Sequence, residues 1–156
     1  MHPVNIRVLI EEWNDLGHVA SSTPLAELKR RGWFMTTFIR TERRPLTHEE
    51  KTLLEWLVAN GSADAKEYSP QIADLRVVGT CTCGCPTIDL AVGDHDQRKT
   101  ASSKILADFV GTTPEGIEVG VILHAREGEI SELEVYAIAN AKEPFRLPTI
   151  ESLKQF

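Results

Sequence analysis

The chain has 156 residues, of which 42% are hydrophobic and 26% are charged, and its formal net charge is -6. This length is enough for one domain with a real core, and the acidic balance argues against a nucleic-acid binder, which usually carries a basic face. No apolar run approaches the roughly 20 residues that span a bilayer, and acidic residues directly after the first apolar run argue against a signal peptide. We therefore expect a cytoplasmic protein in a reducing compartment, with no membrane partner.

The first part of the chain predicts two short helices. Apolar residues recur at helical spacing over 4–16, and 23–32 begins with a Thr-Pro pair and ends at a glycine. We expect residues 1–39 to form a helical extension, which is loosely ordered or was added by the choice of start site, and 40–156 to form the main domain. Packing of both helices onto that domain stays open, because the tryptophans of the extension need burial.

The best-defined helix is expected over 47–60. Thr47 with Glu50 three residues later forms a capping-box pattern, and Gly61 stands where a helix cap belongs. The apolar stripe of this helix comprises Leu53, Leu54, Leu57 and Val58. A central proline in the next segment, 62–75, predicts a loop with at most one helical turn.

From residue 75 onward, hydrophobic and polar residues alternate with period two, which is typical of strands with one face on a core. The expected fold class is α+β: a four- or five-stranded, mainly antiparallel sheet with one principal helix packed on one face, plus the N-terminal helices. A polar loop is expected over 94–103, and an extended tail with two prolines after 142. The strand candidates are Leu75–Cys83, Thr87–Val92, Lys104–Gly111, Ile117–Ala125 and Ile130–Ile138.

Three cysteines occupy every second position between the first two strands: Cys81, Cys83 and Cys85. On an extended strand all three project to one face, with neighbouring positions roughly 6.5–7 Å apart. Free cysteine is among the most buried residue types, which favours small apolar fillers of the core. Two alternatives stay open: a metal site, since thiolates prefer zinc and soft metals, and a reactive thiol beside a cation.

A zinc site of the structural kind usually needs a fourth ligand. His95 in the polar loop and His124 in a later strand are the candidates, and Gly84 and Pro86 could bend the chain to bring the sulfurs together. The one-residue gaps between the cysteines depart from the common two-residue knuckle. We therefore expect no cofactor, with zinc as the alternative.

Three glutamates on adjacent predicted strands, Glu118, Glu132 and Glu134, could form an acidic surface. Such a row is usually a solvated sheet face, but it also suits a protein partner with a basic surface, with association that weakens in salt. The sequence holds no phosphate-cradling glycine loop, nucleophile elbow or zinc-protease histidine pair, which favours a non-enzymatic protein.

Three stretches together carry a resemblance: RPLTHEEKTLLEWL, CTCGCPTIDL and GVILHAREGEISELEVYAI. Over about residues 43 to 148, the chain resembles a group of small uncharacterised bacterial proteins, a domain of unknown function. The CGCP and ELEVY segments carry most of this resemblance. It implies a compact α+β domain and brings no established activity, so no catalytic residue is transferred.

Three functions compete on these observations. The first is a small, soluble, non-enzymatic binding or accessory protein, for example of the immunity type, that recognises a partner by its surface. The second is a metal-binding or thiol-redox protein that uses the three cysteines. The third is an enzyme whose pocket gathers dispersed residues such as Asp89, His95 and His124.

Overall fold

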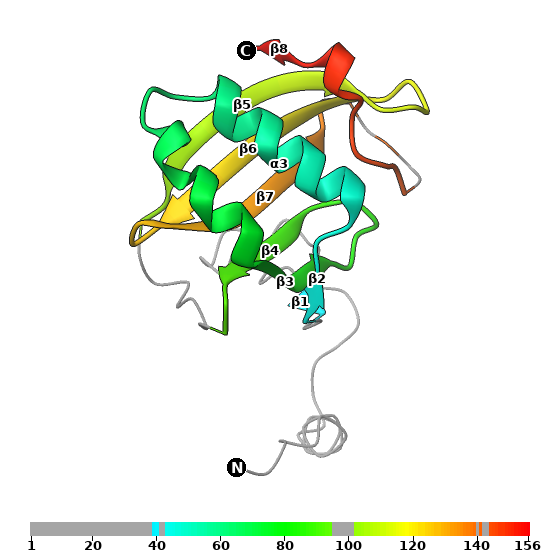
Figure 1. The fold of residues 1–156 in the computed structure, drawn as a ribbon. Helices are drawn as coiled ribbons and strands as arrows, with labels where there is room; N and C mark the ends of the chain where they lie inside the picture. The colour runs from blue at the N-terminus through cyan, green and yellow to red at the C-terminus, as the bar shows by residue number, and fades with distance from the viewer. Residues whose placement is uncertain (1–38, 41–42, 95–101, 140, 142–143) are drawn as a thin grey trace, which may run out of the picture. The chain divides into compact units, whose positions relative to one another are not determined.

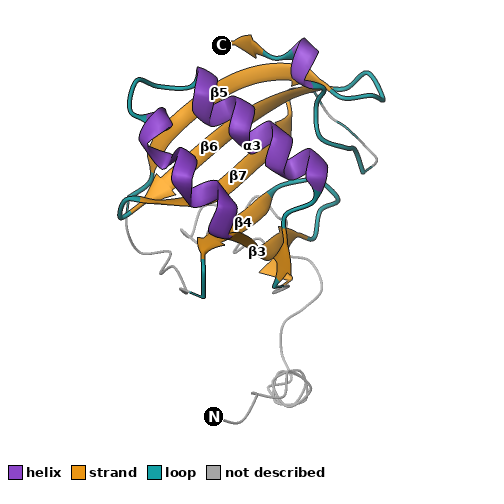
Figure 2. Ribbon diagram, viewed as in Figure 1, coloured by secondary structure: helices purple, strands orange, loops and turns teal. Residues whose placement is uncertain are grey.

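A computed structural model describes residues 39–40, 43–94, 102–139, 141 and 144–156 of the chain. In this part, one helical layer covers one face of a single antiparallel sheet (Figures 1 and 2). The helical layer consists of the α-helix α3 (His48–Asn60) and the 3-10 helix η1 (Ala65–Asp74). The sheet contains β1 (Ile39–Arg40), β2 (Arg44–Pro45), β3 (Leu75–Cys81), β4 (Ile88–Val92), β5 (Lys104–Thr112), β6 (Glu118–Arg126), β7 (Glu129–Ala137) and β8 (Lys154–Gln155).

The order of the strands is β1-β3-β4-β7-β6-β5-β8, and β2 also pairs with β3. A hairpin, β3–β4, therefore lies beside a three-stranded meander, β5–β6–β7, and the antiparallel β4–β7 pair joins them. In that pair Ile88 lies opposite Leu133. The hairpin loop that precedes Ile88 consequently runs beside the second half of β7.

The core lies between α3 and the helix-facing side of the sheet. The predicted apolar stripe of α3 is buried, and alternate residues of β6 and of the second half of β7 belong to the same core, including Val121, Leu123 and Val135. The Trp56 and Phe109 rings meet edge to face, with centroids 4.9 Å apart. The period-two patterns therefore assign the buried face correctly, and the α+β class with one principal helix on one face is confirmed.

The predicted capping box is present at the start of α3. The Thr47 hydroxyl accepts the Glu50 N–H at 3.2 Å, and the Glu50 carboxylate accepts the Thr47 N–H at 2.8 Å. The same carboxylate accepts two hydrogen bonds from the Arg44 guanidinium, at 2.7 and 2.8 Å. Helix α3 is thereby tied to the short strand β2, which pairs with β3.

Replacing Glu50 with glutamine is expected to destabilise the fold by about 2 kcal/mol, because hydrogen bonds to a charged group are lost in a buried site. Burial alone would raise the pKa of Glu50, but its hydrogen bonds with Arg44 and Thr47 outweigh burial and lower that pKa below 4.5. The carboxylate therefore stabilises the fold above pH 4.5, and this contribution disappears as the pH falls through the lowered pKa. Urea unfolding at pH 7 and at lower pH measures it.

The exposed Glu49, in the same helical turn, provides the matched control, and Glu49→Gln should leave the unfolding free energy within about 0.5 kcal/mol of the wild type. An equal loss in both variants, or a loss in Glu50→Gln that does not shrink at low pH, contradicts the assigned role.

Several predictions of secondary structure need correction. The count of four or five strands is too low, because β1, β2 and β8 add three two-residue strands that are too short to show a period. Segment 65–74 is a 3-10 helix rather than a loop, and it buries Ala65 and Ile72 despite Pro70. Gly61 does not adopt the left-handed conformation of a helix cap, since its φ is -75° and its ψ is -152°.

The structure describes the C-terminal tail of the chain but almost none of the predicted N-terminal extension. The predicted extension over 1–39 lies outside the described residues, apart from Ile39 in β1. The tail packs on the domain as expected: η2 (Ile150–Ser152) leads into β8, which pairs with the outer edge of β5.

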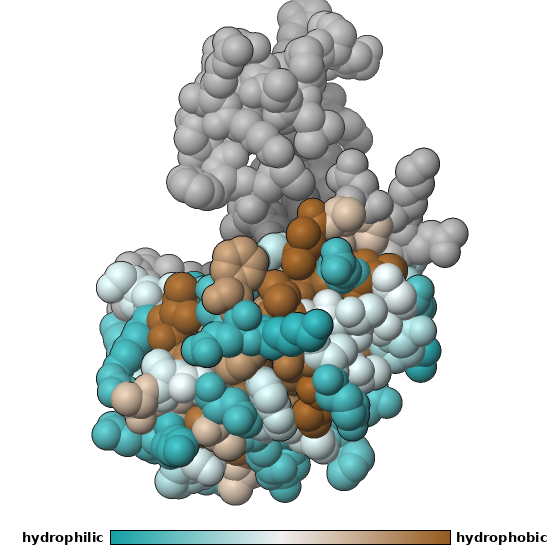
Figure 3. Space-filling model, turned by 90° about the horizontal axis from the view of Figure 1, so that it is seen from above, coloured by the Kyte–Doolittle hydropathy of each residue, from teal (hydrophilic) through white to brown (hydrophobic). Residues whose placement is uncertain are grey.

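Seen from above, over this part of the molecule, hydrophobic side chains lie in patches separated by hydrophilic ones (Figure 3). No helix among the described residues has the length and apolar character needed to cross a membrane.

Candidate metal centre in the β3–β4 hairpin

The three cysteines lie in the hairpin loop that links β3 to β4. Cys81 is the last residue of β3, and its N–H donates to the Thr87 carbonyl oxygen at 3.2 Å, which closes the loop. Gly84 has a φ of +93°, a conformation that side-chain-bearing residues rarely adopt. This left-handed residue turns the chain between Cys83 and Cys85, so the segment folds back instead of continuing as a strand.

The turn gathers the three sulfurs. Cys83 Sγ lies 2.8 Å from Cys81 Sγ and 3.0 Å from Cys85 Sγ, and all three sulfurs lie within 4.8 Å of one another. The N–H groups of Cys83 and Cys85 point at the sulfurs of Cys81 and Cys83, at 3.5 and 3.4 Å. Such N–H donors favour the thiolate form of a sulfur. Three cysteines in this arrangement could hold a metal ion.

The structure corrects two expectations for these residues. The cysteines do not project from one face of a strand, because β3 ends at Cys81 and the loop turns at Gly84. They are not buried fillers of the core either, since Cys83 is exposed and both Cys81 and Cys85 are only partly buried. The hairpin therefore presents its sulfurs at the surface, where a ligand can reach them.

Two of the thiols, Cys81 and Cys83, differ in acidity. Burial, followed by the hydrogen bond with Cys83, raises the pKa of Cys81 to about 12. Burial alone would also raise the pKa of Cys83, but its hydrogen bonds with Cys81 and Cys85 outweigh burial and lower that pKa. Of these two thiols, Cys83 thus carries negative charge more readily than Cys81.

No family model, curated protein or solved structure matches this chain. The resemblance to small bacterial proteins stays an expectation, and the atoms of the hairpin are the basis for assigning its chemistry.

The two predicted histidine ligands do not join the sulfurs within the described residues. His95 lies outside them, and His124 bonds instead through Nε2 to a Glu134 carboxylate oxygen, at 2.9 Å. In the described part of the chain, the group that could hold a metal ion comprises the three cysteines.

The predicted acidic surface is divided in two. Glu132 contacts Arg126 at 3.4 Å and Glu134 contacts His124 at 2.9 Å, so both carboxylates have a cationic or polar partner on β6. Glu118 lies at the far end of β6, opposite Thr112 of β5. A protein partner with a basic surface stays a prediction.

Two of the three residues of the predicted dispersed pocket, Asp89 and His124, lie near each other on the sheet, and the third, His95, lies outside the described residues. Asp89 of β4 and His124 of β6 both lie opposite Glu132 of β7, one from each side. Asp89 and His124 are therefore two strands apart, with Glu132 between them on one face of the sheet. An enzymatic role for this row stays a prediction.

Residues missed by the sequence patterns complete the surroundings of the cysteines. The Thr87 hydroxyl donates to the Val135 carbonyl oxygen at 3.1 Å and accepts the Val135 N–H at 2.9 Å, which holds the hairpin loop against β7. A cavity of about 420 Å³ lies beside the sulfurs, lined also by Tyr136 of β7 and Phe145 of the tail. The β4–β7 pairing, which no local pattern encodes, brings Val135 and Tyr136 to the cysteines.

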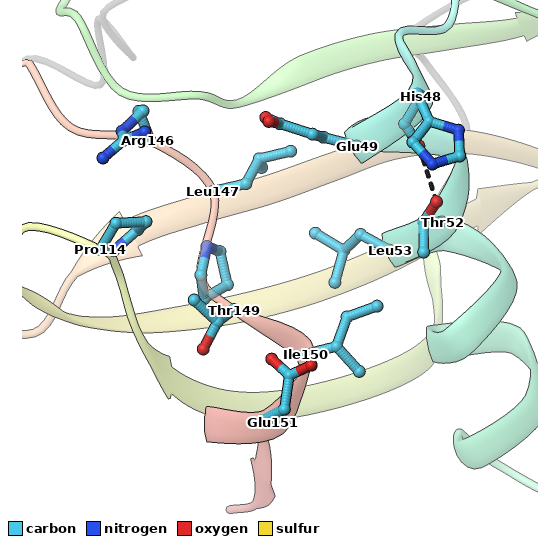
Figure 4. Close-up of a pocket in the computed structure, with 11 residues that line it drawn as sticks. His48, Glu49, Thr52, Leu53, Pro114, Arg146, Leu147, Thr149, Ile150 and Glu151 are labelled. Carbon is cyan, nitrogen blue, oxygen red and sulfur yellow. Dashed lines mark hydrogen bonds between the residues drawn. The ribbon is translucent and has the colours of Figure 1, made fainter.

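A second cavity, of about 300 Å³, lies between the start of α3 and the tail (Figure 4). His48 and Thr52 line one side, where the Thr52 hydroxyl donates to the His48 carbonyl oxygen at 2.8 Å, and Arg146 lines the other. Arg146 is occupied by an ion pair with Glu115 at 2.5 Å. This cavity lacks a group of ligands comparable to the three sulfurs.

Replacing Gly84 with alanine is expected to weaken metal binding about tenfold, a factor that corresponds to about 1.4 kcal/mol. An alanine would be strained at a φ of +93°, and its Cβ would lie 3.1 Å from the Pro144 ring. The metal-free hairpin relieves that strain by opening, and metal binding must then close it. Competition with a chromogenic zinc chelator measures the change.

Gly116→Ala is the matched control. Gly116 has a similar φ of +84°, nothing lies within 4 Å of the added Cβ, and the residue belongs to the β5–β6 turn. This variant should lose stability without losing zinc affinity. Equal affinities in the two variants contradict the role assigned to Gly84.

Proposed function

We propose that this domain binds one thiophilic metal ion through Cys81, Cys83 and Cys85. The observation that carries the proposal is the convergence of three sulfurs within 4.8 Å at the surface of one hairpin. Thiolates are the ligands preferred by zinc and by soft ions such as Cu(I). Zinc is the proposed ion, because it is bound by thiolates in a reducing compartment without any redox change.

The number of ligands favours a site with an open position. Zinc with three protein ligands usually keeps water or another small ligand in the fourth position, whereas purely structural zinc is closed by four protein ligands. Within the described residues the cysteine group supplies three. The proposed site therefore has room to exchange a ligand.

Protons compete with the metal at this site. Because the pKa of Cys81 is raised to about 12, this thiol is protonated at neutral pH and must lose its proton on binding. Zinc affinity should consequently rise with pH across the neutral range. This dependence separates thiolate ligation from loose binding to surface carboxylates, because carboxylates have already lost their protons well below pH 7.

Metal analysis of the full chain tests the proposal. The protein is purified without a histidine tag under reducing conditions, given zinc, and passed through a desalting column. We expect about one zinc ion per chain after desalting. Retention of less than about a tenth of an equivalent by the reduced, folded protein rules out the metal site.

A second candidate function, thiol-based redox chemistry, is favoured by the lowered pKa of the exposed Cys83 and by thiols at 2.8 and 3.0 Å on either side. It requires Cys83 to react faster than Cys81 with iodoacetamide in the metal-free protein at pH 7, as read by mass spectrometry of the labelled peptides. Thiols that resist alkylation in the folded state count against it.

A further inference from the structure

The three sulfurs line a cavity that is large enough for a small molecule. Its volume of about 420 Å³ falls within the range of about 300–1,000 Å³ that is usual for ligand pockets. The β3–β4 hairpin forms one wall, the second half of β7 forms another, and Pro144 and Phe145 of the tail form a third. A metal ion held by the cysteines would therefore face a cavity that is walled on three sides and open to solvent.

The walls of this cavity favour positive charge. Glu132 and Glu134 line it, and none of the described lining residues is Lys, Arg or His. Their partners Arg126 and His124 contact these carboxylates from β6 without lining the cavity themselves. A divalent ion with three thiolates adds a net negative charge to the same space. Burial and the charge of Asp89 on the neighbouring strand raise the pKa of Glu132, as expected where negative groups crowd together.

Aromatic rings add to this preference. Tyr136 and Phe145 both line the cavity, and the face of an aromatic ring attracts cations. The Tyr136 ring packs directly over Gly120 of β6, where a Cβ would overlap it. That contact fixes the ring in place on the sheet.

We propose that the cavity beside the cysteines binds a small aminothiol, whose sulfur occupies the open position of the bound metal ion while its ammonium group contacts Glu132 and Glu134. This inference rests on the proposed metal site. The soft ion selects the sulfur, and the two carboxylates select the positive charge. A neutral thiol of similar size makes only the first of these interactions.

Cobalt(II) in place of zinc makes the site visible, because its absorption bands report the number and type of its ligands. The full chain is loaded with Co(II) and titrated at pH 7.5 with cysteamine and, separately, with 2-mercaptoethanol. The two titrations give a preference ratio for the aminothiol. Comparing this ratio between wild type and variants cancels the intrinsic difference between the two thiols.

Glu132→Gln and Glu134→Gln remove the proposed ammonium contacts while keeping side-chain size. Glu118→Gln is the control, because Glu118 also lies on β6–β7 sheet surface but does not line the cavity. We expect both cavity variants to bind Co(II) as the wild type does. Their preference for cysteamine over 2-mercaptoethanol should fall at least about fivefold relative to the wild type. The control should keep both the metal and the ratio.

Three results overturn the inference. An unchanged ratio in both cavity variants shows that the carboxylates do not select the amine. A cobalt spectrum that neither thiol alters shows that a protein ligand, such as His95, already fills the fourth position. In both cases the metal site itself stands, whereas failure of the wild type to bind Co(II) removes the proposed function together with this inference.

Discussion

Replacing Cys83 with serine is expected to lower zinc affinity by more than about 100-fold. Loss of a residue that only hydrogen-bonds to a metal ligand costs about 10- to 100-fold, and loss of a ligand itself should cost more. Cys83 is the central ligand, 2.8 and 3.0 Å from the sulfurs on either side. Its pKa is lowered, so protons compete with the metal less at Cys83 than at Cys81, whose pKa is raised to about 12. Competition with a chromogenic chelator measures the affinity of the full chain.

Thr82→Ser is the matched control for this variant. Thr82 is the exposed neighbour of Cys83 in the same turn, and it offers no sulfur. Its zinc affinity should stay within about twofold of the wild type, and both metal-free variants should unfold at nearly the same urea concentration, since both sites are exposed. Zinc affinity in Cys83→Ser equal to that in Thr82→Ser means that the hairpin is not the site.

Replacing Gly61 with alanine is expected to destabilise the domain by about 3 kcal/mol, at the upper end of the cost of overpacking. An added Cβ would overlap the carbonyl oxygen of Leu106 in β5 and would lie 2.8 Å from that of Leu57 in α3. Both leucines are completely buried, and Ser62 N–H donates to the Leu106 oxygen at 2.7 Å. Both atoms belong to the backbone, so relief of the overlap requires a shift of α3 relative to β5.

Urea unfolding of the metal-free protein measures this effect, and Gly93→Ala is the comparison. Gly93 has a φ of +61°, and nothing lies within 4 Å of its added Cβ, so its substitution should cost only about 1 kcal/mol for backbone strain. If Gly61→Ala costs no more than Gly93→Ala, the contact between the end of α3 and β5 is looser than the structure indicates.

The elements that the sequence predicts well are those with a repeating local pattern. The alternation of Leu133 and Val135 with the polar residues Glu132, Glu134 and Tyr136 in β7 places both the strand and its buried face correctly. The Thr47 and Glu50 pair places the start of α3 to the residue. In each case the signal lies within a few neighbouring positions, which is the range over which helix and strand periods act.

What the sequence does not predict depends on contacts between distant segments. The position of Gly61 after the helix predicts a helix cap. The structure gives another reason for a glycine there, because β5 approaches too closely to leave room for a side chain. That approach involves a distant segment and leaves no local pattern. The cysteines carry a period-two pattern, yet Gly84 turns the chain and converts an apparent strand face into a cluster of sulfurs. The pairing of β4 with β7 brings Glu134 and Tyr136 to that cluster from about 50 residues away.

X-ray absorption at the zinc edge of the loaded full chain is the most direct test of the central claim, that Cys81, Cys83 and Cys85 together hold one ion. We predict three sulfur neighbours at about 2.3 Å from the zinc, the distance typical of zinc–thiolate bonds. A shell made up of nitrogen and oxygen at about 2.0–2.2 Å, with at most one sulfur, contradicts the assignment of the hairpin as a metal centre.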